Sequence, residues 1–379
     1  AKSLGKEITL AGWAYNFRSS GSIYFLQLRD GTGRIQCVIS KKEVPEATWE
    51  ACQKLTIESS VVVRGVVNED KRSSTGYEMK VVSVEIVSIA EEYPIGKKEH
   101  GTDFLMDNRH LWLRSSRQEA ILRVRSEVVF AIQEFMRSEK FVLTHTPTFT
   151  PNACEGTSDL FPVQYFNRTA YLTQNGQLYL EALAMAFGRV YDLNPNFRAE
   201  KSKTRRHLTE FWSVNPEVAF LVHRESMDLQ ERLVVAIVRT VLDRCAGELA
   251  VLERDVEKLR VVTQGNFPRL SYKEAIKKLQ ELGSDIKEGD DLGGDDETLL
   301  TRAYDRPLFI ERWPKTIKPF YMKTDPDDPT RVLNNDLYAP EGYGEIIGGS
   351  EREDDYATLR ASILAHKLPL KDFEWYLDL

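Results

Sequence analysis

The segment from Phe197 to Phe211 combines side-chain types that can hold a nucleotide. Two strand-like runs, residues 189–198 and 207–218, flank a polar and basic loop, so we expect an antiparallel hairpin. On such a hairpin the guanidinium of Arg198 can grip a phosphate at two points while the ring of Phe211 stacks on adenine. From these residues alone, a surface hairpin with solvated charges is an equally good interpretation.

Over its whole length the same segment resembles the second signature motif of the class II aminoacyl-tRNA synthetases. The resemblance implies that Arg198 binds the α-phosphate of ATP and the attacking carboxylate, and that Phe211 stacks on the adenine. It also implies that Glu200 contacts the adenine or the tRNA end. The reaction is then an in-line displacement at the α-phosphorus, which depends on orientation and charge stabilisation, so we expect no catalytic triad. The residues expected to reach the outer phosphates are Arg206 and His207.

A second segment, from Gly344 to Arg352, resembles the strand that lines the same pocket in the aspartate, asparagine and lysine branch of this family, subclass b. The resemblance implies that Glu345 holds Mg²⁺ on the ATP phosphates, since this cation prefers hard oxygen ligands. It further implies that Arg352 grips the side chain of the amino-acid substrate. A surface arginine in an ion pair is the alternative interpretation of Arg352. The expected catalytic residues are Arg198, Glu345 and Arg352.

Two shorter segments complete the pocket in the family pattern. Residues 154–158 resemble the mobile loop over the amino acid, and residues 173–179 form the second segment. By this resemblance, Glu155 and Gln177 bind the ammonium group of the substrate. Each segment is a weak signal alone, because Gly-Thr-Ser loops and Gln-Leu-Tyr helices are common, but their order along the chain agrees with the family.

Two positions bear on the identity of the amino acid. Leu180 stands where the aspartyl members place a lysine, so a carboxylate substrate would be desolvated with Arg352 as its only partner. A neutral amide fits better, and the resemblance is closest to the asparagine-specific members. Those members usually have a glutamate at the position of Asn215, which accepts a hydrogen bond from the substrate amide, so we expect looser discrimination against aspartate. Alternatively, Asn215 merely shapes the strand or a neighbour supplies the contact. The candidate neighbours are Asp192, Asn175 and Asn335.

The elements before residue 90 read as five strands with one short helix between the third and fourth. This order matches the oligonucleotide-binding (OB) barrel. Phe25 and Gln36 fall on adjacent strands, at the family positions that stack on and hydrogen-bond an anticodon base. The alternative is a barrel face with ordinary exposed residues, because such folds bind many ligands. The predicted strands are residues 8–15, 23–29, 34–40, 61–67 and 77–87, with the helix at 46–55.

A charged linker over residues 90–110 separates this barrel from a second domain over residues 111–379. Helical periodicity predicts one helix over residues 115–138 and a longer one over residues 225–259, whose apolar stripes we interpret as core. The predicted fold class is therefore α+β. An N-terminal five-stranded OB barrel over residues 1–89 is followed by a class II synthetase antiparallel sheet flanked by helices.

Composition restricts the class of protein. The 379 residues are 42% hydrophobic and 29% charged, as in a globular protein of roughly two or three domains. The net charge of −7 argues against indiscriminate nucleic-acid binding, although local basic faces suffice for one tRNA. The four cysteines lie far apart, which indicates reduced thiols in a cytoplasmic protein. No apolar run is long enough for a membrane span, so we expect no membrane partner.

The resemblance implies an enzyme that uses ATP and Mg²⁺ to convert asparagine to an adenylate and transfers it to the asparagine tRNA. Pro147 resembles the first family motif, which forms the dimer interface, so a homodimer is expected.

The third class II motif, a glycine-rich segment ending in an arginine, has no match before Leu379. A chain ending there would have an incomplete site, so we expect the protein to continue. The alternatives are a paralogue that adenylates an amino acid for another use, against which Phe25 and Gln36 argue, and an inactive RNA-binding module, which the missing motif favours.

Overall fold

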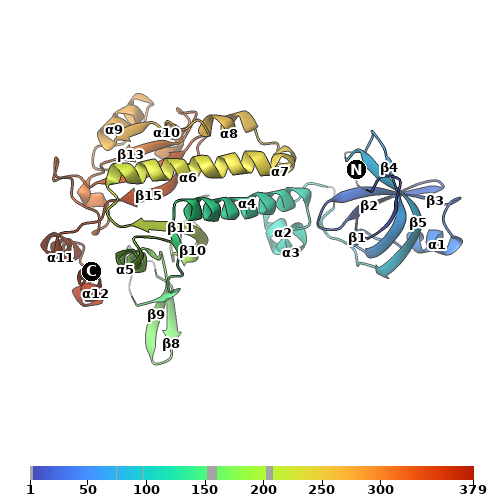
Figure 1. Cartoon of the computed structure of the whole chain (residues 1–379), viewed down its shortest axis with the longest axis horizontal. Helices are drawn as coiled ribbons and strands as arrows, with labels where there is room; N and C mark the ends of the chain where they lie inside the picture. The colour runs from blue at the N-terminus through green and yellow to red at the C-terminus, as the bar shows by residue number, and fades with distance from the viewer. Residues whose placement is uncertain (1–2, 74, 97, 152–159, 202–207) are drawn as a thin grey trace. The chain divides into compact units, whose positions relative to one another are not determined.

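The structure, a computed structural model, describes residues 3–73, 75–96, 98–151, 160–201 and 208–379. The chain forms two compact units, Ala1–Arg114 and Ser115–Leu379, whose elements are drawn in Figure 1. None of the helices in the described ranges combines the length and the hydrophobicity that a membrane crossing requires.

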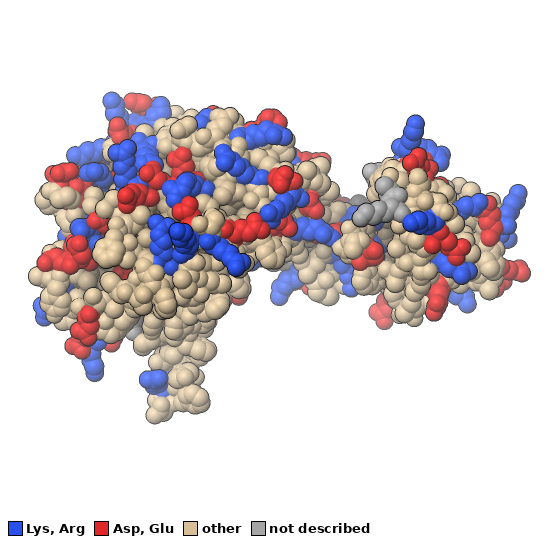
Figure 2. Space-filling model, viewed as in Figure 1, with Lys and Arg blue, Asp and Glu red and all other residues tan. Residues whose placement is uncertain are grey.

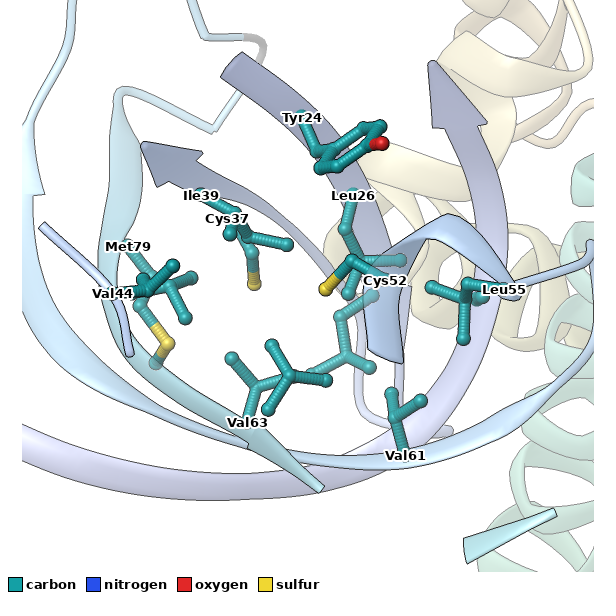
Figure 3. Packing of buried hydrophobic residues seen from close by; sticks show 14 of the residues in the cluster. Tyr24, Leu26, Cys37, Ile39, Val44, Cys52, Leu55, Val61, Val63 and Met79 are labelled. Atoms are coloured by element: carbon teal, nitrogen blue, oxygen red, sulfur yellow. The ribbon is translucent and has the colours of Figure 1, made fainter. Parts of the chain in front are cut away.

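The first unit contains a closed barrel with the strand order β1-β2-β3-β5-β4, which confirms the predicted OB fold. Figure 3 shows that side chains of the inward positions, Leu26, Ile39 and Val63 among them, fill the barrel interior. Each such side chain contributes about 1.5–3 kcal/mol when fully buried. Burial in this core also raises the pKa of the Cys37 thiol to about 12, as expected for an inert, reduced cysteine. The elements are β1 (Glu7–Ser20), β2 (Ile23–Arg29), β3 (Arg34–Ser40), α1 (Glu46–Gln53), β4 (Ser60–Glu69) and β5 (Tyr77–Ser88).

Two short helices, α2 (Thr102–Asp107) and α3 (Arg109–Trp112), follow the barrel within the first unit. A buried charge network ties the barrel to the end of this segment. Arg29 donates two hydrogen bonds of 2.9 and 2.8 Å to Glu58, and Arg114 donates to the same carboxylate at 3.1 Å. The predicted domain limits, residues 1–89 for the barrel, 90–110 for the linker and 111–379 for the second domain, stay a prediction.

The described residues of the second unit form three small sheets, which are mostly antiparallel. The predicted hairpin is present as β10 (Arg189–Phe197) and β11 (Glu210–Val218), and β6 (Val142–Leu143) runs parallel to β10. A second sheet has the order β12-β13-β14-β15, and a third has the order β7-β9-β8. Together with the flanking helices these sheets confirm the predicted α+β class. The remaining strands are β7 (Phe149–Thr150), β8 (Pro162–Tyr165), β9 (Arg168–Leu172), β12 (Arg269–Ser271), β13 (Leu308–Glu311), β14 (Asn334–Ala339) and β15 (Gly344–Ser350).

Two long helices, α4 (Ser116–Ser138) and α6 (His223–Arg244), lie side by side (Figure 1). The first agrees with its prediction, and Ser115 caps it by accepting a 3.3 Å hydrogen bond from the N–H of Gln118. The prediction of a single helix over residues 225–259 is wrong. The chain leaves helical geometry after Arg244 and again at Glu253, which has a positive φ of 54°.

The apolar periodicity nevertheless continues past Arg244 because the next two helices pack on the same core. These are α7 (Ala246–Val251) and α8 (Val256–Val262), and Cys245, Leu249 and Leu259 share one cluster with residues of α4 and α6. Periodicity alone therefore could not show where the helix ends. The other helices of the second unit are α5 (Gln177–Phe187), α9 (Tyr272–Glu281), α10 (Gly294–Thr301), η1 (Lys315–Ile317), α11 (Tyr356–Ala365), η2 (Leu370–Phe373) and α12 (Glu374–Leu377).

Candidate active site

The β10–β11 hairpin has an apolar face and a polar face because side chains alternate along a strand. Tyr191, Val214 and Val218 pack with α4 and α6 in one hydrophobic core. The opposite face is polar, so the sheet presents hydrogen-bonding groups on the side away from these helices. Its polar residues on β10 and β11 are Asp192, Asn194, Asn196, Ser213, Asn215 and Glu217.

Arg198 and Phe211, the residues expected to bind the phosphate and the adenine, come together at the loop end of this hairpin. The N–H of Arg198 donates to the carbonyl of Thr209 at 3.0 Å, which extends the strand pairing to that position. The guanidinium carbon lies 5.4 Å from the centroid of the Phe211 ring, and the ring is half-buried. A planar cation beside such a ring can bind a phosphate and a base of the same nucleotide. Glu200 follows two residues after Arg198 and is also half-buried.

Arg352, two residues after the end of β15, forms the centre of an ionic cluster. Its Nη2 donates to Glu217, and its Nη1 donates to the hydroxyl of Ser350 at 2.5 Å. Its Nε forms a 3.1 Å ion pair with Glu181, and the guanidinium lies 5.0 Å from the ring centroid of Tyr321. The ion pairs considered as an alternative are therefore present, but the side chain is only 25% exposed and faces the polar side of the hairpin.

The charges in this cluster do not balance. Burial alone would favour the neutral form of Arg352, but Glu217 and Glu181 hold its pKa above the ordinary arginine value. Burial raises the pKa of Glu217 to about 7, a rise that Arg352 opposes and Glu181 reinforces. Two carboxylates thus share one guanidinium. An additional cationic group, such as the ammonium of an amino acid, would relieve their repulsion.

Helix α5 brings the predicted residue Gln177 to the same cluster. Its side-chain Nε2 donates to Glu181 at 3.0 Å. Leu180 on the same helix is fully buried and packs against Val190, the cross-strand partner of Glu217. Leu180 stands where the aspartyl members of the family place a lysine. It therefore lies next to the cluster and adds no positive charge to it.

Glu345, the expected metal ligand, lies on β15 and faces a second acid that the sequence analysis missed, Asp336 on β14. A methyl group added to Gly348 would lie 3.2 Å from Glu345 Oε1 and 3.7 Å from Asp336 Oδ1, so both carboxylates approach one point. Lys318 donates to the other oxygen of Asp336 at 2.6 Å. The signal for Asp336 in the sequence is an acid inside an otherwise buried strand, because such a charge needs a partner.

This carboxylate pair fits a divalent cation. Although Glu345 remains partly exposed, desolvation raises its pKa to about 8, Asp336 adds to the rise and Lys318 opposes it. A bound cation would reverse this effect by stabilising both ionised forms. The described part of the chain holds no group of three or more His, Cys, Asp or Glu side chains that could bind a metal. Phosphate oxygens and water would therefore complete the coordination of Mg²⁺.

Asn215 contacts one of its three candidate neighbours. It lies opposite Asp192 in the strand register, and its Nδ2 donates to Asp192 Oδ1 at 2.7 Å. Asn175 instead accepts from the N–H of Gln177 at 2.8 Å. Asn335 is buried against α6, where its Nδ2 donates to Gln230 at 2.7 Å.

Three other predicted site residues lie outside the described ranges, namely Glu155, Arg206 and His207.

In the barrel, Phe25 and Gln36 both point outward from the buried positions of β2 and β3. Phe25 is half-buried, with the guanidinium carbon of Arg18 4.7 Å from its ring centroid. Gln36 hydrogen-bonds Glu78, its register partner on β5, whose pKa is raised by burial and by Asp70. The structure therefore adds Arg18 and Glu78 to the surface predicted to read an anticodon base.

Comparisons with known proteins agree with this arrangement. Residues 101–379 match the family of class II tRNA synthetases (D, K and N), and residues 8–87 match the OB-fold nucleic acid binding domain. The chain is 52% identical over 379 residues to the asparagine--tRNA ligase of Lactobacillus johnsonii, which covers 100% of this chain and 88% of that protein.

Two solved structures extend the comparison to the fold. The asparaginyl-tRNA synthetase from Pyrococcus horikoshii, complexed with asparaginyl-adenylate, matches with a TM-score of 0.96 and 43% identity over 100% of this chain and 87% of that chain. The Entamoeba histolytica asparaginyl-tRNA synthetase, in complex with asparaginyl-adenylate, matches with a TM-score of 0.86 and 30% identity over 98% of this chain and 86% of that chain. With a barrel of the OB fold, a polar sheet face and matches along the whole sequence, the chain belongs to the class II tRNA synthetases of the D, K and N group.

Proposed function

We propose that this chain is an asparagine--tRNA ligase that activates asparagine with ATP and transfers it to tRNA. The observation that carries the proposal is the polar face of the β10–β11 hairpin. It places the Arg198–Phe211 pair and the Arg352 cluster on one side of one strand pair. The identity to enzymes of that name over the full chain supports the choice of asparagine.

In the first step, a carboxylate oxygen of asparagine attacks the α-phosphorus of ATP. A carboxyl–phosphate bond forms, the bond between the α- and β-phosphates breaks, and pyrophosphate leaves with the electron pair. Arg198 stabilises the charge that develops on the α-phosphate, and Phe211 holds the adenine in place. Gln177 and Glu181 receive the ammonium group, and Arg352 donates to the side-chain oxygen of asparagine.

In the second step, a ribose hydroxyl at the tRNA end attacks the activated carbonyl carbon. An ester bond forms, the carbonyl–phosphate bond breaks, AMP leaves with the electron pair, and the hydroxyl proton is released. We assign Glu345 and Asp336 to Mg²⁺, which when bound neutralises charge on the ATP phosphates. Glu200 follows Arg198 along the chain, where it can contact the adenine or the tRNA end. We also assign Glu155, Arg206 and His207 to the substrate ammonium and the outer phosphates by their place in the family motifs.

For the anticodon, the half-buried ring of Phe25 offers a stacking surface and Gln36 offers an amide beside it. Aromatic stacking together with amide hydrogen bonds is how barrels of this kind bind single-stranded bases. On the face shown in Figure 2, Lys and Arg are interspersed with Asp and Glu over both units. This mixed surface fits a protein that binds tRNA at local sites rather than over a broad basic surface.

We further propose that the enzyme is a cytoplasmic homodimer. The segment around Pro147, which resembles the first family motif, carries apolar side chains that a monomer would leave in water. Four residues of α4 and this segment are each at least 41% exposed, namely Phe130, Val142, Leu143 and Phe149. Large exposed apolar groups of this kind are typical of protein interfaces. Light scattering during size-exclusion chromatography would give the mass, and a monomer at micromolar concentration would contradict the proposal.

The test of function is ATP–pyrophosphate exchange by the full-length protein with each of the twenty amino acids, followed by charging of total tRNA. Exchange with asparagine and charging of the asparagine tRNA are expected. Exchange without charging would indicate a synthetase paralogue that adenylates an amino acid for non-translational use. Failure of both reactions, in a folded protein that still binds tRNA, would indicate an inactive RNA-binding module.

A further inference from the structure

We propose that Asp192 is a positioning residue that fixes which end of the Asn215 side-chain amide faces the substrate, and that it thereby sets the preference for asparagine over aspartate. This inference rests on the proposed function. It concerns a residue of β10 that has no direct role in the chemistry described above.

The contact between the two residues is direct and well defined. Asp192 and Asn215 are register partners on β10 and β11, and Asn215 Nδ2 donates to Asp192 Oδ1 at 2.7 Å. A carboxylate can only accept hydrogen bonds, so it can hold only the NH₂ end of an amide. The carbonyl oxygen of Asn215 must then point elsewhere. The Ser213 hydroxyl lies 3.0 Å from Asn215 Nδ2 and 3.3 Å from Asn215 Oδ1, so it contacts both ends of the amide and does not determine this orientation, because a hydroxyl both donates and accepts.

Asp192 is itself held rigidly. It has no solvent exposure, and the hydroxyl of Thr146 donates to its second oxygen at 2.6 Å. A methyl group added to Gly176 would lie 2.1 Å from that same oxygen, so the backbone of residue 176 closes the space on this side. The carboxylate therefore keeps one oxygen for Thr146 and one for Asn215.

The orientation matters because Asn215 lies on the same strand face as Glu217, two residues further along β11. Glu217 accepts a hydrogen bond from Arg352. The face thus offers a donor, the Arg352 guanidinium, and an acceptor, the Asn215 carbonyl oxygen. A primary amide satisfies both with its own oxygen and NH₂. A carboxylate would set an oxygen against the Asn215 carbonyl, which costs affinity because neither group can donate.

This arrangement changes the expectation for Asn215. An asparagine was expected to discriminate poorly because its amide can flip and donate to a carboxylate. Asp192 opposes that flip, so a neutral residue at position 215 can still select an amide. The negative charge that a glutamate at position 215 would supply is instead carried by Asp192 on the neighbouring strand. It acts on the substrate only through the orientation of Asn215.

The first test is Asp192→Asn, with exchange kinetics for asparagine and for aspartate. In this variant, Thr146 can still donate to the new amide oxygen at position 192, which turns the new NH₂ toward Asn215. The Asn215 amide then flips and presents its own NH₂ to the substrate. We expect the ratio of kcat/KM for asparagine to that for aspartate to fall about tenfold, equivalent to about 1.4 kcal/mol. An unchanged ratio would overturn the proposal.

The second test is the exchange of both residues, Asp192→Asn with Asn215→Asp. It preserves the hydrogen bond between the paired positions and the single negative charge, and position 215 again presents only an acceptor to the substrate. The ratio should return to within about threefold of the wild-type value. A merely structural role for Asp192 would lower thermal stability without moving the ratio. If the single variant does not fold, the double variant decides, because a folded double variant without the asparagine preference contradicts the proposal.

The two proposals fail in different ways. A wild-type protein that exchanges with neither amino acid would refute the proposed function. A wild-type protein that prefers asparagine, together with an Asp192→Asn variant of unchanged ratio, would refute only the role of Asp192.

Discussion

The hydroxyl of Tyr376 donates a 2.5 Å hydrogen bond to Glu181 Oε2, while Oε1 of the same carboxylate forms an ion pair with Arg352. Tyr376 lies on α12 and Glu181 on α5, so two helices distant in sequence meet behind the residue assigned to the substrate side chain. The hydrogen bond orients the carboxylate that Arg352 and Gln177 share.

Removing this hydroxyl in Tyr376→Phe should therefore affect asparagine binding more than ATP binding. A hydrogen bond to a charged group contributes about 1.5–3 kcal/mol, part of which would appear as lost stability. We expect KM for asparagine to rise about tenfold, with KM for ATP changed less than twofold. Tyr343→Phe, at an exposed position, is the matched control. Equal changes in both KM values would show that Tyr376 supports the whole fold rather than the amino-acid site.

Arg198→Ala should abolish adenylate formation while leaving the fold intact. The guanidinium lies beside the half-buried ring of Phe211, on the polar side of the sheet, where it can contact a ligand. Loss of one contact to the transition state typically costs roughly a hundredfold or more in rate. Exchange kinetics and circular dichroism test the two parts of this expectation. Arg189→Ala, at the opposite end of β10, should keep nearly full activity, and an active Arg198→Ala enzyme would contradict the assignment.

Phe25→Ala and Gln36→Ala should each weaken tRNA charging without altering pyrophosphate exchange, because the barrel and the adenylation residues lie in separate units. A stacked base contributes about 1–3 kcal/mol, so KM for tRNA should rise roughly tenfold for Phe25→Ala. Steady-state charging with purified tRNA measures this effect. A parallel loss of both activities would mean that the barrel positions serve stability instead.

Stability should fall on acidification because His223 resists protonation in the fold. Burial lowers its pKa to about 4, although Glu351 opposes the shift. The unfolded chain binds this proton near pH 6.5, so stability contributed by His223 is present above that pH and is lost as pH falls toward 4, by at most about 3 kcal/mol. His223→Gln should flatten the dependence of Tm on pH between 6.5 and 4. The exposed His110→Gln should not, and identical slopes in all three proteins would exclude His223 as the cause.

The sequence predicted the barrel and the hairpin well because both are built from strands with a clear alternation and short polar turns. The predicted hairpin also implied that Arg198 and Phe211 lie close together, as they do in the structure, since the register of a hairpin fixes which residues of its two strands are neighbours. It could not locate the end of α6, because Cys245 and Leu249 continue the apolar stripe into the next helix. Asp336 was missed because its meaning depends on Glu345, which faces it only after β14 and β15 pair.

Asn215 shows the same limitation at the level of specificity. The sequence named Asp192 among the possible neighbours of Asn215, and the structure brings these two residues into contact. The direction of the Asn215 amide depends on a hydrogen bond across two strands and on the absence of space around Asp192. Both are consequences of packing, which a single sequence does not display.

The central claim, that the Arg352 cluster selects asparagine, is tested most directly by ATP–pyrophosphate exchange with asparagine, aspartate and lysine on the wild-type protein and on Arg352→Gln. We predict that the wild type prefers asparagine over both other amino acids. The variant should lose roughly a hundredfold or more in kcat/KM for asparagine while its KM for ATP stays nearly constant. A wild-type preference for aspartate or lysine, or an Arg352→Gln variant that activates asparagine normally, would contradict the claim.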